Sequence, residues 1–164
     1  MSLENTSLLE TLCVQAEDYP WVSGSFGGAS MRMLSLAVDS GTWVVQTRMP
    51  PGLASPTHRH TGCVYAFTMS GRWGYREYDW WAKPGSFVHE PAGVVHTLVI
   101  PEDNSEMAEV IYVVEGGNIN FDADGTFLYY EDGHGMRDFY VSACREQGYD
   151  PPARFIGDRQ AGIL

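Results

Sequence analysis

The stretch PPGLASPTHRHTG, residues 50–62, decides the fold. It holds His58 and His60, which are separated by a single residue. In a β-strand, residues two positions apart point to the same face, so both imidazole rings are expected to project together. Imidazole is a ligand for several transition metals, and two rings on one face can bind the same ion. The pattern therefore predicts a strand that carries two metal ligands.

A third histidine lies in a second stretch, TMSGRWGYREYDWWAKPGSFVHEPAGVVHTL, residues 68–98. This histidine, His96, follows a Pro-x-Gly turn. Residues typical of turns surround the histidines. Gly52 precedes His58, and four more lie between His60 and His96: Gly71, Gly85, Pro91 and Gly93. These surroundings strengthen the interpretation of His58 and His60 as metal ligands and make His96 a candidate third ligand.

Outside these stretches the chain reads as short strands between turns, at intervals of about 8–12 residues, which is typical of an antiparallel sandwich or barrel. The expected strands cover residues 31–38, 42–49, 58–69, 72–78, 82–90, 94–100 and 107–114. One helix is expected where Met136, Phe139, Tyr140 and Ala143 have helical spacing, with Gly148 after its end. The sequence predicts an all-β fold with a short C-terminal helix packed outside.

Composition and charge limit the function. The 164 residues are 44% hydrophobic and 19% charged, which is typical of one globular domain. The net charge of −11 argues against nucleic acid and anionic membranes as partners, because both attract positive surfaces. No segment reaches the roughly 18 apolar residues of a membrane span, and residues 1–10 lack the features of a signal peptide. With three widely spaced cysteines, a cytoplasmic protein with reduced thiols is expected.

The two stretches resemble the cupin family. Its first motif is matched by Gly52, His58, His60 and Gly71, and its second by Gly85, Pro91, Gly93 and His96. The resemblance implies a single jelly-roll barrel over residues 31–130. Residues 1–30 are then an N-terminal arm with strands that packs on the barrel, and residues 131–164 are the C-terminal helix and tail. Cupins frequently dimerise, so a homodimer is expected.

The chain departs from the cupin pattern at two positions. Val64 stands where the first motif has a glutamate, and Ile100 where the second has an asparagine. The resemblance therefore implies a site in which His58, His60 and His96 hold the metal without a carboxylate ligand. Ligand type alone does not choose the metal. Fe(II) is expected, with Zn, Ni and Mn as alternatives.

Residues 50–98 are more closely similar to cupins of the 2,4'-dihydroxyacetophenone dioxygenase family and to the cupin half of ChrR-type anti-sigma proteins. The dioxygenase resemblance implies non-haem iron held by three histidines. It also implies that O2 cleaves the bond between a carbonyl carbon and its hydroxylated neighbour. The expected partners are then O2 and a small carbonyl compound, a hydroxyketone or diketone. The alternatives are a zinc-bound ChrR-like sensor module, an oxygen-independent isomerase or lyase, and a structural cupin with a vestigial site.

Glu90 is the candidate catalytic residue. It stands immediately before the Pro-x-Gly turn, where typical cupins have an apolar residue facing the interior. A buried carboxylate is costly unless it is paired or hydrogen-bonded, and beside a metal it could move a proton from a substrate hydroxyl. The alternative is a salt bridge at the barrel rim with Arg48, Arg72 or Arg76.

The substrate pocket is expected to include residues near the metal. Val64 has the same parity as the two histidines of the first stretch and is expected to face the interior with them. Trp73, Tyr75 and Glu77 alternate along one expected strand, and family parity turns their shared face inward. The aromatic rings on that face could stack on a ring-shaped substrate, although such rings more often belong to the core.

Overall fold

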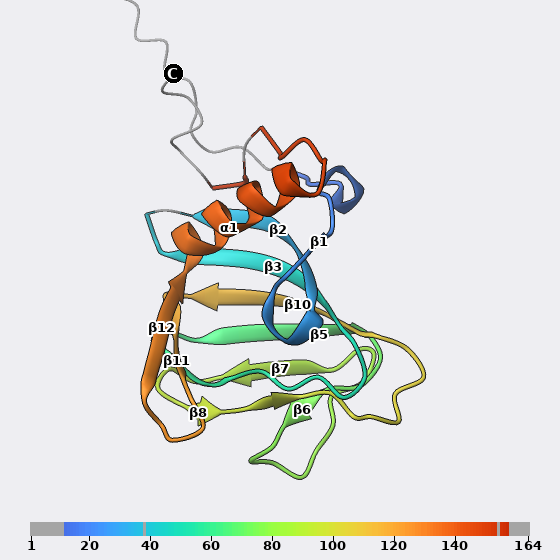
Figure 1. The fold of residues 1–164 in the computed structure, drawn as a ribbon, viewed down its shortest axis with the longest axis vertical. Coiled ribbons are helices and arrows are strands. Elements are labelled where there is room, and N and C mark those ends of the chain that lie inside the picture. Colours follow the sequence, from blue (N-terminus) through green and yellow to red (C-terminus); the bar gives the residue numbers. More distant parts are fainter. Residues whose placement is uncertain (1–11, 38, 154, 158–164) are drawn as a thin grey trace, which may run out of the picture.

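The computed structural model describes residues 12–37, 39–153 and 155–157, and its strands form two facing sheets (Figure 1). The elements, in chain order, are η1 (Ala16–Asp18), β1 (Val22–Ser23), η2 (Phe26–Gly28), β2 (Ser30–Ala37), β3 (Thr42–Met49), β4 (Thr57–His60), β5 (Val64–Ser70), β6 (Gly74–Tyr75), β7 (Phe87–Glu90), β8 (Val95–His96), β9 (Leu98–Val99), β10 (Ala108–Glu115), β11 (Gly117–Phe121), β12 (Phe127–Asp132) and α1 (Gly133–Glu146).

The larger sheet has six strands in the order β1-β2-β3-β10-β5-β7, and its strand pairs are antiparallel. The second sheet has four strands in the order β12-β11-β4-β8. A short antiparallel pair, β6 and β9, forms a third, two-stranded sheet. Strands far apart in the sequence are neighbours in both sheets, as in a jelly roll. The predicted all-β barrel is confirmed.

Alternation of side chains along the strands builds the core. On β3 and β10, every second residue points between the sheets and is buried, while the intervening residues are less buried for the most part. The buried residues of these two strands include Trp43, Val45, Met49, Val110 and Val114. The side of the interior that the larger sheet forms is therefore mostly apolar, with few buried polar side chains.

The structure corrects several predicted strands. The extended segment 58–69 is interrupted at residues 61–63, so β4 and β5 belong to different sheets. The predicted strand 72–78 is reduced to β6, and the chain turns at residues 76–77. β11 and β12 were not predicted at all. The predicted strand 31–38 ends at Ala37, and residue 38 lies outside the described residues.

The C-terminal helix α1 is confirmed and packs outside the barrel. It contacts β1, β2 and β12, and Figure 1 shows it lying across one end of the larger sheet. Asp132 caps its N-terminus by accepting a hydrogen bond from the Gly135 amide, at 2.9 Å. Gly148 follows its end with a φ of +80°, which glycine adopts without a steric penalty. Tyr140, on the buried face of the helix, is fully buried.

None of the helices in the described part of the chain combines the length and the apolar character that crossing a bilayer requires. Residues 1–10, for which a signal peptide was not expected, lie outside the described residues.

Gly71 and Gly85, two glycines of the sequence motifs, provide a matched test of the fold. Both have a positive φ, +66° and +86°. A Cβ on Gly71 would lie 2.7 Å from the Cα of Ala108 and from the carbonyl oxygen of Met107, whereas a Cβ on Gly85 would meet nothing within 4 Å. Gly71→Ala is therefore expected to lower the free energy of unfolding by about 2–4 kcal/mol, and Gly85→Ala by only about 1 kcal/mol. Urea denaturation of both variants measures the difference, and equal losses would contradict the close contact.

Candidate metal centre

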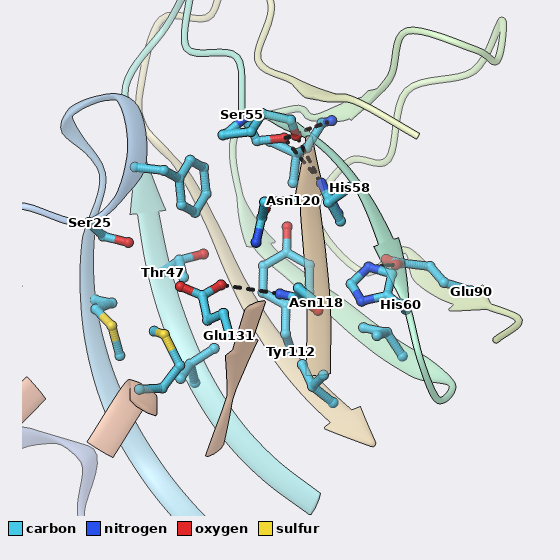
Figure 2. A pocket seen from close by; sticks show the side chains of 18 of the residues that line it. Ser25, Thr47, Ser55, His58, His60, Glu90, Tyr112, Asn118, Asn120 and Glu131 are labelled. Carbon is cyan, nitrogen blue, oxygen red and sulfur yellow. Dashed lines mark hydrogen bonds and ion pairs between the residues drawn. The ribbon is translucent and has the colours of Figure 1, made fainter. Parts of the chain in front are cut away.

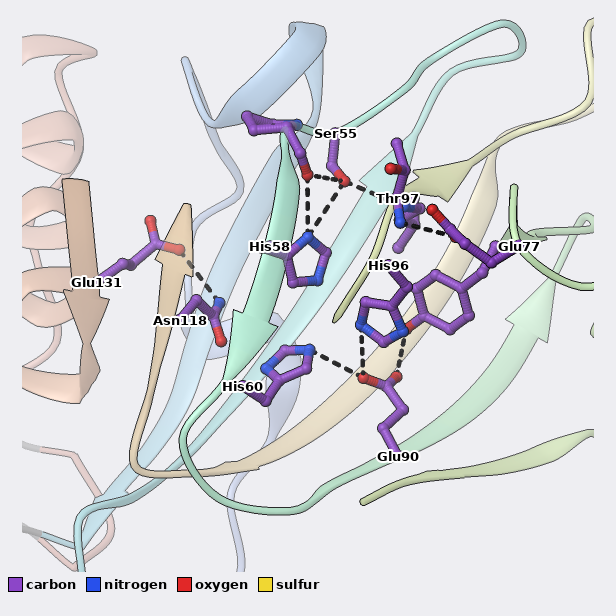
Figure 3. A network of polar contacts seen from close by, with 12 residues as sticks. Ser55, His58, His60, Glu77, Glu90, His96, Thr97, Asn118 and Glu131 are labelled. Carbon is purple, nitrogen blue, oxygen red and sulfur yellow. Dashed lines mark hydrogen bonds and ion pairs between the residues drawn. The ribbon is translucent and has the colours of Figure 1, made fainter. Parts of the chain in front are cut away.

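The three histidines converge inside the barrel. His58 and His60 point inward from β4, and His96 comes from β8, where its Cα is paired with that of His58. Their exposed fractions are 8%, 5% and 1%, so all three rings are buried (Figure 3). Ring centroids are 4.8–5.2 Å apart. The expectation that two distant stretches of chain would bring these rings together is confirmed.

The ring nitrogens are arranged to hold a metal ion. One nitrogen from each histidine lies within 4.8 Å of the other two, so a small inward movement would place all three about 2.1 Å from a shared ion. The Nδ1 atom of His58 is 3.0 Å from the carbonyl oxygen of Pro56, which fixes the ring and leaves Nε2 free for a metal. The Nε2 atom of His96 is buried without a hydrogen-bond partner among the described residues. These residues fit a divalent metal.

Burial keeps the imidazoles of His58 and His96 neutral, which is the form that binds metals. It lowers the pKa of His58, and the neighbouring His60 lowers it further. It also lowers the pKa of His96 to about 4. At neutral pH the rings of His58 and His96 therefore offer lone pairs without first having to lose a proton.

Glu90 lies beside the three rings. It ends β7, opposite Val64 on β5, and its side chain is 3% exposed. Its Oε2 atom is 2.9 Å from Nε2 of His60 and 3.5 Å from Nε2 of His96. These are ion-pair distances rather than aligned hydrogen bonds. Burial raises the pKa of Glu90, but His60, the hydrogen bond from Tyr75 and the nearby His96 together outweigh it, so the pKa lies below its ordinary value.

The predicted alternative for Glu90, a salt bridge at the barrel rim, is wrong. Arg48 pairs with Glu109 at 2.7 Å, and Arg72 pairs with Asp103 at 2.9 Å. Among the described residues, no ion pair joins Glu90 to either of these arginines or to Arg76, which is exposed. The carboxylate instead faces the histidines, in the interior of the barrel.

Tyr75 holds both Glu90 and His96. Its hydroxyl donates a hydrogen bond to Oε1 of Glu90. Its ring stacks on the imidazole of His96, with centroids 3.7 Å apart and an angle of 4° between the planes. The aromatic face therefore fixes the orientation of one candidate ligand, while the hydroxyl fixes the carboxylate beside it.

The other residues predicted for the pocket take different positions. Trp73 is fully buried in the core, where its indole donates to the Thr68 hydroxyl, and it does not line the cavity. The shared inward strand face predicted through Glu77 is wrong, because Glu77 lies in the turn after β6 and is exposed. Its carboxylate accepts a hydrogen bond from the Thr97 amide, at 3.0 Å, next to His96.

A cavity extends from the histidines between the two sheets (Figure 2). It has about 90 Å³ available to the centres of water-sized molecules, which is room for several waters or for a small organic molecule. Val64, Tyr75 and Glu90 line it near the histidines. A second hollow lies next to this cavity, between residues 24–26, β12 and α1. Phe26 and Tyr129 line both the cavity and this second hollow.

Polar residues that sequence reasoning missed also line the cavity. They are Thr47, Tyr112, Asn118, Asn120 and Glu131. Three of them lie on β11 and β12, the two strands that were not predicted. The alternation Asn118-Ile119-Asn120-Phe121 was the available signal, since a period of two is typical of a strand with one polar face.

A barrel of antiparallel strands that encloses three converging imidazoles is a cupin with a candidate metal centre. The chain belongs to the family described as the ChrR cupin-like domain, which matches residues 9–120. No curated protein sequence matches the chain.

Solved structures share this fold. A protein of unknown function with a cupin-like fold from Ralstonia eutropha JMP134 is 34% identical, with 90% of this chain and 91% of that one covered and a TM-score of 0.80. An RmlC-like cupin from the same organism is 25% identical, with 92% and 97% covered and a TM-score of 0.83. An acetylacetone dioxygenase from Acinetobacter johnsonii is 16% identical, with 87% and 98% covered and a TM-score of 0.71. At that identity the dioxygenase shows the fold alone.

The lowered pKa of His96 predicts how stability depends on pH. An unfolded histidine takes up a proton near pH 6.5, but folded His96 does so only near pH 4. The unfolded state therefore binds more protons between these values, and the free energy of unfolding of the metal-free protein is expected to fall as pH drops from 6.5 toward 4. Urea denaturation across this range measures the slope. It should be shallower in His96→Gln and unchanged in His89→Gln, an exposed histidine; an unchanged slope in His96→Gln would contradict the burial effect.

Proposed function

We propose that the protein is a non-haem dioxygenase that uses a metal, Fe(II), held by His58, His60 and His96. It cleaves a C–C bond of a small hydroxyketone or diketone with O2. The observation that supports this proposal best is the donor set: three buried imidazoles with a carboxylate beside them that is not among the converging ligands. Such a set leaves coordination positions open for substrate.

The metal, when bound, would supply a positive charge and open positions for two substrate oxygens and for O2. Because the three protein ligands are neutral, that charge is not reduced and favours an anionic enolate or enediolate. For a hydroxyketone the atoms balance without a further reductant. One bond breaks between the carbonyl carbon and the carbinol carbon, and the two oxygen atoms of O2 enter the two carboxylic acids formed.

The chain's own residues prepare the substrate for this reaction. In this proposal, Oε2 of Glu90 accepts the proton that a hydroxyketone or diketone loses when it becomes an enolate; its position 2.9 Å from Nε2 of His60 supports this role. The Tyr75 hydroxyl donates to the other oxygen and orients the carboxylate. Val64 and the surrounding core keep bulk water away from this end of the cavity, which strengthens the interactions among the charged groups.

The shared fold with the acetylacetone dioxygenase from Acinetobacter johnsonii supports a diketone or related compound as substrate. The family match favours a second candidate, a zinc-bound ChrR-like module that senses a ligand. An isomerase or lyase would use the same three histidines without oxygen. The three candidates therefore differ in metal and in their need for O2.

Metal analysis and oxygen consumption test the proposal. The protein is purified without added metal, its metals are measured, and O2 uptake is followed with hydroxyketones and β-diketones. Iron together with substrate-dependent O2 uptake is the expected result. Zinc with no O2 uptake would favour the sensor, and product formation under anaerobic conditions would favour the isomerase or lyase. Either result would overturn the dioxygenase.

A further inference from the structure

The inward faces of the four-stranded sheet form two rows of polar residues that lead away from the metal centre. In the first row, Asn120 is paired with His58 on one side and with Tyr129 on the other. In the second, Asn118 is paired with His60 and with Glu131. The polar side chains of β11 and β12 therefore extend the face that carries the histidines (Figure 2).

Several polar atoms at this end of the cavity have no partner. The Nδ2 atom of Asn120 and the Oδ1 atom of Asn118 are buried without a hydrogen bond among the described residues. On the larger sheet, across the cavity, the same is true of the Thr47 and Tyr112 hydroxyls. The exposed fractions of Asn120, Thr47 and Tyr112 are 5%, 5% and 9%. A buried polar group without a hydrogen bond is costly, so four in one cavity indicate a polar guest.

The sheet fixes the distance of this region from the metal centre. Neighbouring strands are about 4.8 Å apart, so β11 lies about one strand spacing from His58 and His60, and β12 about 10 Å from them. A molecule that chelates the metal at one end would therefore place its other end among these polar atoms. The cavity accepts such a molecule only if its far end forms hydrogen bonds.

The charges in the cavity define the chemistry of that far end. Glu131 lies in the second row, and Asn118 donates to it at 3.3 Å. Among the described residues, no lysine or arginine side chain lines the cavity, whereas two carboxyl groups do. A carboxylate or phosphate would meet the side chains of Glu131 and Asn118 Oδ1 without a compensating cation. A hydroxyl or amino group can donate to those oxygens, and a hydroxyl can also accept from Asn120.

We propose that this cavity contains a second binding subsite, which holds a hydroxyl or amino group of the substrate at the end opposite its metal-chelating oxygens. The subsite is formed by Thr47, Tyr112, Asn118, Asn120 and Glu131. It rests on the proposed function only in that a metal at the histidines anchors the other end of the molecule. It narrows the substrate class to compounds with a hydrogen-bond donor far from the chelating oxygens.

Binding of hydroxamates to the metal-loaded protein without O2 tests the subsite apart from turnover. Hydroxamates chelate metals through two oxygens, and the para substituent of benzohydroxamate lies at the opposite end of the molecule. Calorimetry is expected to show that the para-hydroxy probe binds about tenfold or more tightly than the para-methyl probe of similar size. The para-carboxy probe is expected to bind more weakly than both. Acetohydroxamate reports access to the metal alone.

Variants that remove only a hydroxyl identify the subsite. In Tyr112→Phe and Thr47→Val, the preference for para-hydroxy over para-methyl is expected to shrink severalfold, while affinity for acetohydroxamate is unchanged. Because each substitution removes an unpaired buried group, thermal stability is expected to stay equal or rise, which a structural role would not produce. Tyr65→Phe is the matched control, since Tyr65 lies on the adjacent strand β5 and stacks with Phe87 and His89, away from the cavity.

The outcomes separate the subsite from the proposed function. Equal binding of the para-hydroxy and para-methyl probes, or a preference that survives both variants, would overturn the subsite. So would binding of acetohydroxamate but of none of the aryl probes. A protein that prefers the para-hydroxy probe yet never consumes O2 loses the dioxygenase proposal and keeps the subsite. A protein that takes up no metal and binds no probe overturns both.

Discussion

Replacing His96 with alanine is expected to abolish stoichiometric metal binding, and all metal-dependent activity with it. The substitution leaves only two converging nitrogens, both on β4. Changes to residues that merely orient a ligand cost about 10–100-fold in metal affinity, so the loss of one of three direct ligands is expected to cost more than about 100-fold. Competition with a chelator measures the affinity, and metal analysis after dialysis measures the occupancy.

The experiment needs controls for packing and for chance metal binding. The ring of His96 also stacks on Tyr75, so alanine leaves a gap in a buried site. His58→Ala removes a ligand without that stack and is expected to give the same loss of metal. His89→Ala removes an exposed histidine that stacks on Tyr65 outside the barrel, and is expected to retain metal fully. Iron retained by His96→Ala, or O2 consumption by iron-free protein, would contradict a shared three-histidine site.

Two of the three candidate ligands could be predicted because their determinants are local, whereas His96, paired with His58 across β4 and β8, was assigned through the resemblance to the cupin motifs. The spacing of His58 and His60 fixes their common face through the period of a strand, whatever surrounds them. The strand 42–49 and the C-terminal helix were also correct, since both have regular apolar spacing. The sequence predicts such elements correctly because their patterns depend only on residues close together in the chain.

What the sequence did not predict depends on contacts between distant segments. In the sequence, Glu77 continues the alternation of a strand. In the structure, β6 pairs with β9 over only two residues, and Glu77 lies in the turn that follows. Asn118 and Asn120 look like surface residues until the pairing of β11 with β4 turns them toward the histidines. The register between strands that are distant in sequence is set by the packing of the whole barrel. It cannot be predicted from the sequence of one strand alone.

The pairing of Val64 with Glu90 relates the sequence motif to the contact between two strands. The sequence showed a valine where the cupin motif has a glutamate, which implies the loss of a metal ligand. The structure places Glu90 directly opposite that valine, on the neighbouring strand β7. A carboxylate is therefore still present at the metal centre, but it enters from another strand and lies beside the converging nitrogens instead of among them. In the proposed reaction this carboxylate is the proton acceptor and not a metal ligand.

Glu90→Gln is expected to preserve the fold and the metal while lowering kcat by about 10²–10⁴-fold. Glutamine has nearly the same shape and its amide oxygen can still accept the hydrogen bond of Tyr75, but it cannot take a proton from substrate. Steady-state O2 uptake measures kcat and KM separately. KM is expected to change little, because the proton acceptor acts in the reaction rather than in holding the substrate. Glu115→Gln, an exposed glutamate at the end of β10, is the matched control.

The pH profile and a second variant distinguish proton transfer from positioning. Since the pKa of Glu90 lies below its ordinary value, the carboxylate is ionised in the wild type throughout the neutral range, and the activity it supports should be lost only in acid. That acidic limb is expected to disappear in Glu90→Gln. Tyr75→Phe keeps the stack on His96 but removes the hydrogen bond that orients Glu90, so it is expected to cost only about tenfold and to keep the limb. If Glu90→Gln instead released the metal, the carboxylate would be a fourth ligand, and the division between three neutral donors and a separate base would be wrong.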